Sequence, residues 1–93
     1  MKFLNEFIFD KEADAKKFIK DMSELFYIKG YLYYGDVCKA YYNDGIDYNH
    51  YDIYTCYGWI CLYKFEVETY LDDKFIVRFP EIEKLKQILN KGE

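Results

Sequence analysis

Residues 57–80 read YGWICLYKFEVETYLDDKFIVRFP, and this stretch decides the fold. Along its first half every second residue is apolar or neutral, which is the period of a β-strand with one face in water. The alternation resumes after Asp72-Asp73 and ends at Pro80, because proline has no backbone donor for a sheet. The pattern predicts a β-hairpin over about 60–79, with a turn of two residues or more.

A hairpin alone is marginally stable in water, so the rest of the chain should cover its apolar face. Upstream, apolar residues recur at helical spacing between Ala15 and Phe26. Asp10 is placed to cap this helix and Gly30 to end it. The sequence therefore predicts an amphipathic N-terminal helix of about four turns, whose other face carries solvated pairs such as Glu12 with Lys16.

Shorter patterns predict the remaining elements. Between residues 3 and 9, apolar residues stand at both odd and even positions, which favours a short strand packed on both faces. Residues 31–34 are a brief strand or an extended connection, and a short helix should start at Gly35-Asp36. Residues 53–57 re-enter as a strand, and a C-terminal helix follows Pro80.

These patterns predict an α+β fold in which one domain spans residues 1–93. A small, mainly antiparallel sheet, with the hairpin at its centre, packs against the N-terminal helix. The second and C-terminal helices are short. A chain of 93 residues can bury one small core and no second domain.

Charge and cysteine content exclude several classes of function. The net charge is −4 and Arg78 is the single arginine, which argues against direct binding of nucleic acid. No apolar run is long enough to span a membrane, so no membrane partner is expected. Three cysteines without metal-ligand spacing or a signal peptide indicate a reduced, cytoplasmic location in the host cell.

Catalytic and metal sites are weakly indicated. Asp44, Asp47, His50 and Asp52 offer oxygen and imidazole ligands, but they lack the spacing of a calcium loop, so a solvated loop is the default interpretation. Cys38 with His50 has no third orienting residue, and buried cysteines usually behave as small hydrophobes. We therefore predict no enzyme activity, no catalytic residue, no metal and no cofactor.

Tyrosines are the stronger indication of function. Ten of the twelve lie between Tyr27 and Tyr57, and a core this small cannot bury them all with their hydroxyls bonded. Exposed tyrosines among carboxylates would form an acidic surface that suits arginine and lysine side chains. The predicted protein-binding residues are Tyr33, Tyr34, Asp36, Tyr41, Tyr42, Asp44, Asp47, Tyr48, Tyr51, Asp52 and Tyr54.

Other interpretations of the tyrosines stay open. They could be half-buried sheet residues whose hydroxyls reach water. Stacked rings could hold the base of a small nucleotide, so that the chain is a ligand-binding module or a sponge for a nucleotide signal. A homodimer joined through the tyrosine face or a sheet edge is the third hypothesis.

Three sequence blocks carry a resemblance: FIFDKEADAKKFIKDMSELF (7–26), GYLYYGDVCKAYY (30–42), and YGWI (57–60) followed by the hairpin. Their order resembles small anti-defence proteins of phages and mobile elements of low-GC bacteria, including anti-CRISPR inhibitors. The resemblance implies a non-enzymatic inhibitor that binds a basic, nucleic-acid-binding protein surface, as on a CRISPR effector or other defence nuclease. Within YGWI, Trp59 is expected to be a core or corner residue first and a contact residue second.

Overall fold

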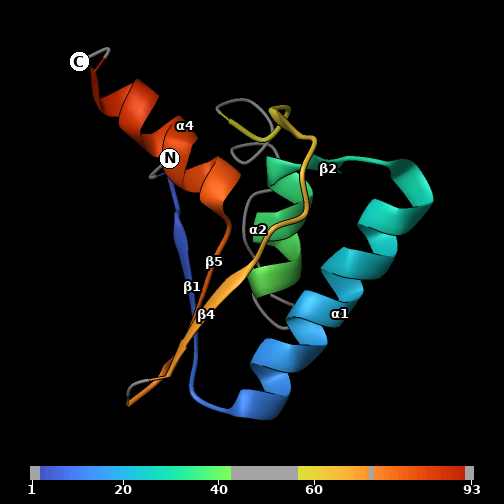
Figure 1. Ribbon diagram of the computed structural model, residues 1–93, viewed down its shortest axis with the longest axis vertical. Coiled ribbons are helices and arrows are strands. Elements are labelled where there is room, and N and C mark those ends of the chain that lie inside the picture. The colour runs from blue at the N-terminus through green and yellow to red at the C-terminus, as the bar shows by residue number, and fades with distance from the viewer. Residues whose placement is uncertain (1–2, 43–56, 72, 92–93) are drawn as a thin grey trace.

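The computed structural model describes residues 3–42, 57–71 and 73–91 and has the predicted α+β fold (Figure 1). In chain order, its elements are β1 (Glu6–Phe9), α1 (Glu12–Lys29), β2 (Leu32–Tyr33), α2 (Tyr34–Tyr42), β3 (Cys61–Leu62), β4 (Glu68–Leu71), β5 (Phe75–Arg78) and α4 (Pro80–Lys91). Among the described residues, no helix is both long and apolar enough to cross a membrane.

The main sheet is antiparallel, with strand order β1-β5-β4. Phe7 lies opposite Val77, which lies opposite Thr69, so these three side chains share one face. The amphipathic α1 packs against this sheet, and its buried residues Phe18 and Met22 join Phe7 and Val77 in the core (Figure 1). The predicted packing of the N-terminal helix on the sheet is therefore confirmed.

The hairpin consists of β4 and β5, and it is shorter than the alternating pattern predicts. Leu71 pairs with Phe75, so three residues separate the paired positions and the turn is longer than two residues. The predicted continuous strand from Cys61 is wrong, because β3 (Cys61–Leu62) pairs with β2 in a separate two-stranded sheet. Residues 63–67 connect the two sheets, and period-two alternation does not reveal such a break.

α1 ends as predicted but begins one residue later than Asp10 would allow. Gly30 adopts a left-handed conformation (φ 80°), and its N–H donates to the Phe26 carbonyl at 2.6 Å. At the other end Lys11 occupies the capping position and makes no side-chain capping hydrogen bond, so the prediction for Asp10 was wrong. Acidic residues in the first turn still favour the helix through its dipole.

α2 covers the outer edge of β1 by means of two tyrosine hydroxyls. The Leu4 N–H donates to the Tyr34 hydroxyl at 2.6 Å, and that hydroxyl donates to the Leu4 carbonyl at 2.7 Å. Tyr41 makes the same pair of bonds with Ile8, at 3.2 and 3.1 Å. These side chains replace a neighbouring strand and so protect an edge that could otherwise pair with another chain.

β1 is buried on one face only. Phe7 has no exposed surface, whereas Ile8 keeps 41% of its surface exposed. The prediction of a strand packed on both faces was therefore wrong, because no described element covers the face of the sheet opposite α1. The predicted strand at 53–57 falls mainly outside the described residues, while α4 begins at Pro80 as expected.

Candidate functional site

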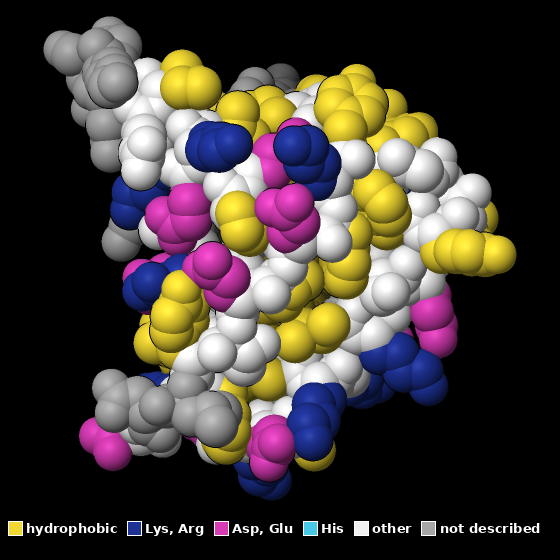
Figure 2. Space-filling view, viewed as in Figure 1, with side chains coloured by type: hydrophobic (Ala, Val, Ile, Leu, Met, Phe, Trp, Pro, Cys, Tyr) yellow, Lys and Arg dark blue, Asp and Glu magenta, His cyan; other side chains and the backbone are white. Residues whose placement is uncertain are grey.

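Aromatic side chains gather on the outer face of the β2–β3 sheet, where Trp59 and Tyr63 are exposed and Tyr31 and Tyr33 are half-buried. We call Tyr31, Tyr33, Trp59 and Tyr63 the aromatic surface. The Tyr31 and Tyr33 ring centroids lie 5.2 Å apart, and those of Tyr33 and Trp59 lie 5.5 Å apart, both at near-perpendicular angles. Figure 2 shows hydrophobic side chains gathered over this end of the molecule, where β2 and the segment after residue 57 lie.

Strand alternation explains why these rings point outward. Leu32 lies opposite Leu62 in the β2–β3 ladder, and each exposes 1% of its surface. Their neighbours Tyr33 and Cys61 also lie opposite each other and must point to the other face. The same alternation places Tyr31 and Tyr63 on that outer face. Leu32 and Leu62, buried on the inner face of the same strands, therefore anchor the aromatic surface to the core.

Trp59 is exposed, which corrects the expectation of a core residue. Its side chain leaves 63% of its surface accessible. The backbone on both sides of it is held to the start of α2: the Gly35 N–H donates to the Gly58 carbonyl and the Tyr34 N–H to the Ile60 carbonyl, each at 2.9 Å. The indole is therefore presented from a chain segment with fixed hydrogen bonds.

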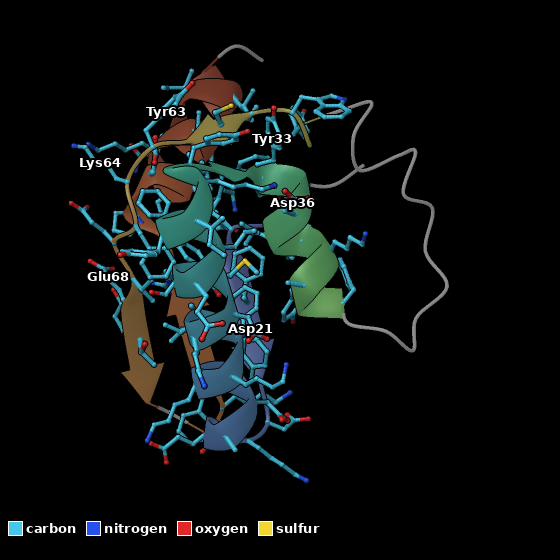
Figure 3. All side chains as sticks on the ribbon, turned by 90° about the vertical axis from the view of Figure 1, so that its right-hand side faces the viewer. Asp21, Tyr33, Asp36, Tyr63, Lys64 and Glu68 are labelled. Carbon is cyan, nitrogen blue, oxygen red and sulfur yellow. The ribbon has the colours of Figure 1, made fainter. Side chains whose placement is uncertain are left out.

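The chain after β3 is held by a carboxylate on α4. Glu81, in the first turn of α4, accepts the Tyr63 N–H at 3.3 Å and the Lys64 N–H at 3.1 Å. These two bonds fix the backbone at Tyr63, which leaves 67% of its surface exposed. Figure 3 shows Tyr33, Tyr63 and Lys64 at the same end of the molecule, far from Asp21 on α1.

The hydroxyls of the aromatic surface are neutral hydrogen-bonding groups. A hydrogen bond with the Tyr31 hydroxyl is the main cause that raises the pKa of Tyr33, and one with the Cys61 thiol raises the pKa of Tyr63. Lys29 Nζ lies 3.8 Å from Asp36 Oδ2, and the Asp36 carboxylate also acts on Tyr33. The surface thus offers apolar rings with uncharged polar tips.

The predicted site residues have different environments. Tyr33 belongs to the aromatic surface, and Asp36 lies beside it in the first turn of α2. Tyr34 has no exposed surface for a partner to contact: it is the first residue of α2, and its side chain turns into the core. Tyr41 is half-buried, with its hydroxyl bonded to Ile8, and Tyr42 is 37% exposed near the end of α2.

The remaining predicted residues lie outside the described part of the chain: Asp44, Asp47, Tyr48, Tyr51, Asp52 and Tyr54. The loop considered as a metal site, with His50, lies there too. Within the described residues, no group of three or more metal-ligating side chains is close enough to hold an ion. Burial raises the pKa of the Cys38 thiol to about 11, so at neutral pH it is protonated and a poor nucleophile.

A groove between α1, β1 and α2 is the main alternative site. It has a volume of about 450 Å³, within the range of small-ligand pockets. Its lining consists of Phe9, Asp14, Lys17, Phe18, Asp21, Ala40 and Tyr41. Lys17 pairs with Asp21 at 2.7 Å, and Asp14 adds a further negative charge. Such a lining repels phosphate groups, so the groove does not favour the nucleotide-binding hypothesis.

The site residues predicted from the sequence do not include Tyr31, Trp59 and Tyr63, the other members of the aromatic surface. For Tyr63 the alternating pattern points the wrong way, because it places Tyr63 on the apolar face of the predicted strand, whereas Leu62 is the buried residue there. For Trp59 no signal existed, since a tryptophan before a strand is more often buried than exposed.

Comparison of the chain with models of protein families, with curated proteins and with solved structures finds no match.

Proposed function

We propose that this chain is a non-enzymatic inhibitor that binds a basic protein surface through its aromatic surface. The exposure of Trp59 and Tyr63, at 63% and 67%, carries the proposal. Tryptophan and tyrosine are enriched in the energetically dominant positions of protein interfaces, because they bury a large area for a small loss of side-chain entropy. Rings fixed by buried neighbours and backbone hydrogen bonds lose little further freedom on binding.

Charge supports the choice of a basic partner. The chain carries a net charge of −4, which steers it towards positive surfaces. Arginine and lysine side chains of such a partner can stack on the exposed rings of Trp59 and Tyr63 and pair with carboxylates of the chain. A surface that binds nucleic acid has this composition, so occupying it would block a CRISPR effector or another defence nuclease, as the sequence resemblance implies.

The test compares two variants of equally exposed residues. Trp59→Ala removes the indole from the aromatic surface, while Ile88→Ala removes a side chain on α4 that is 64% exposed. Tagged proteins are used to capture partners from a nuclease-treated lysate of a low-GC bacterium, and affinities for a captured basic protein are then measured. Loss of the indole should weaken binding roughly 30-fold, or about 2 kcal/mol, with Ile88→Ala unchanged. Equal affinities of the two variants would contradict the proposal.

The electrostatic part is tested separately. Replacing Asp44, Asp47 and Asp52 with lysine reverses three charges of the predicted acidic surface. We expect slower association and weaker binding, with a smaller dependence on ionic strength than the wild-type chain shows. Wild-type affinity of the triple variant at moderate salt would mean that apolar contacts alone bind the partner.

A further inference from the structure

We propose that the free edge of β4 is a second interaction site, distinct from the aromatic surface, which takes an extended segment of a partner protein as an added antiparallel strand. The segment has alternating apolar and basic residues. Its apolar side chains enter a cavity between β4 and α1, and its basic side chains lie on the opposite face. Strand addition of this kind combines main-chain hydrogen bonds with pockets for alternate side chains.

The two edges of the main sheet differ in how they are covered. On β1, the tyrosine hydroxyls of α2 bond the backbone of Leu4 and Ile8. β4 pairs with β5 on one side, and no described element pairs with its other side. Figure 3 shows β4 at the margin of the molecule, with Glu68 pointing outward. An exposed edge of this kind is a template for an additional strand.

The register of the sheet identifies the outward backbone groups of β4. The N–H and carbonyl of Ile8 face α2, so those of its neighbour Phe7 face Val77 on β5. Ile76 then faces β4, where it lies opposite Tyr70. By the same alternation, the N–H and carbonyl of Thr69 point away from β5 and are available to an added strand.

A cavity lies where an added strand would place its side chain. It has a volume of about 290 Å³ and adjoins the β4 edge on the α1 side of the sheet. It is lined by Glu12, Ala15, Lys16, Ile19, Thr69 and Phe75. The side chain opposite Thr69 points to this same face. Apolar surface of the half-buried Ile19 and Phe75 is thus left for a valine-sized or leucine-sized residue to cover.

Charge decides the identity of the added segment. The edge and its flanks carry the exposed carboxylates Glu66, Glu68 and Asp73 against two exposed lysines, Lys64 and Lys74, of which Lys74 pairs with Asp10. Basic residues at alternate positions of an added strand would lie beside these carboxylates and gain from the pairing. A second copy paired antiparallel about Thr69 would place Glu68 opposite Tyr70 and diagonal to the other copy's Glu68, so it would bring like charges close without supplying a basic partner. The occupant is therefore a basic segment of another protein.

A synthetic peptide tests the backbone part of the proposal. The probe is a fluorescent seven-residue peptide of alternating lysine and valine, and binding to the full chain is followed by fluorescence anisotropy. In the antiparallel arrangement, the valines that enter the cavity also direct their N–H groups to β4. N-methylation of the valines should weaken binding about tenfold or more, whereas N-methylation of the lysines should not. Equal binding of the three peptides would overturn the proposal.

Protein variants test the location of the site. Thr69→Pro removes the outward N–H, a change that edge strands tolerate, and should weaken peptide binding about tenfold. Thr69→Ala keeps the donor and should weaken peptide binding far less than Thr69→Pro does. If circular dichroism shows that Thr69→Pro does not fold, the N-methylated peptides still test whether backbone hydrogen bonds hold the added strand. Loss of peptide binding in Trp59→Ala would overturn the proposed site. If the chain alone formed a dimer and Thr69→Pro dissociated it, the proposed occupant would be overturned.

Discussion

The hydroxyl of Tyr34 should contribute far more to stability than the hydroxyl of an exposed tyrosine. It accepts the Leu4 N–H at 2.6 Å and donates to the Leu4 carbonyl at 2.7 Å, while the side chain itself is fully buried. Tyr34→Phe deletes this one oxygen. The ring remains and can keep its stacking with Phe3, whose centroid is 4.6 Å away, so the change removes only the hydrogen bonds of the hydroxyl, the two with Leu4 and one with the Cys38 thiol.

The expected loss follows from the groups left without a partner. An unsatisfied buried donor or acceptor costs about 1–3 kcal/mol, and the two bonds to Leu4 are part-buried, so water can replace some of the interaction. We therefore expect Tyr34→Phe to lower the free energy of unfolding by about 2 kcal/mol. For a chain of 93 residues this corresponds to a fall in Tm of roughly 10 °C.

Urea unfolding followed by circular dichroism measures the difference. Tyr27→Phe is the matched control, because that side chain is 90% exposed and its variant should remain within about 0.5 kcal/mol of the wild type. Tyr34→Phe should also speed amide hydrogen exchange at Leu4. If Tyr34→Phe were as stable as Tyr27→Phe, the hydroxyl would not hold the β1 edge and the account of α2 as its cover would be wrong.

Three further outcomes are expected. Tyr41→Phe should cost about 0.5–1 kcal/mol, since its bonds to Ile8 are longer and exposed. Gly30→Ala should cost about 1 kcal/mol in urea unfolding, because φ is 80° and no neighbouring atom lies within 4 Å of an added Cβ, so backbone strain acts alone. The Cys38 thiol should make stability fall between pH 9 and pH 11, by at most roughly 1.4 kcal/mol per pH unit. Its pKa is near 9.0 in the unfolded chain and about 11 in the folded chain, so the unfolded state binds fewer protons in this range. Cys38→Ala should flatten this slope, and an unchanged slope would exclude the thiol as its cause.

Local patterns predicted the helices and the hairpin because their physical causes lie close together in the sequence. The apolar residues between Ala15 and Phe26 recur at helical spacing and so form one apolar face, which is enough to predict α1. Gly30 supplies the left-handed residue that ends this helix. The hairpin similarly depends on the alternation on either side of its turn. The failure at Cys61 has a different cause: which strand β3 pairs with depends on the position of β2, twenty-eight residues away, and no local pattern encodes that choice.

The candidate site was predicted only in its residue type. The excess of tyrosines indicates an exposed aromatic face, and the half-buried Tyr33 contacts the exposed Trp59 in the aromatic surface. Tyr34 follows it directly, yet it turns into the core, because the chain changes from strand to helix between these two residues. Trp59 is exposed because backbone bonds to α2 fix the segment around it. Both outcomes depend on tertiary contacts that composition does not contain.

The most direct test of the aromatic surface uses its tryptophan as a probe. Trp59 is the single tryptophan of the chain, so labelling with fluorotryptophan gives one ¹⁹F NMR signal that no tryptophan of an unlabelled partner can obscure. In the free protein this signal should respond to dissolved paramagnetic oxygen, since the side chain is 63% exposed. On addition of the captured basic protein, the signal should shift and lose that response as the indole is buried. A bound complex in which the signal keeps its free position and its response would contradict the proposed function.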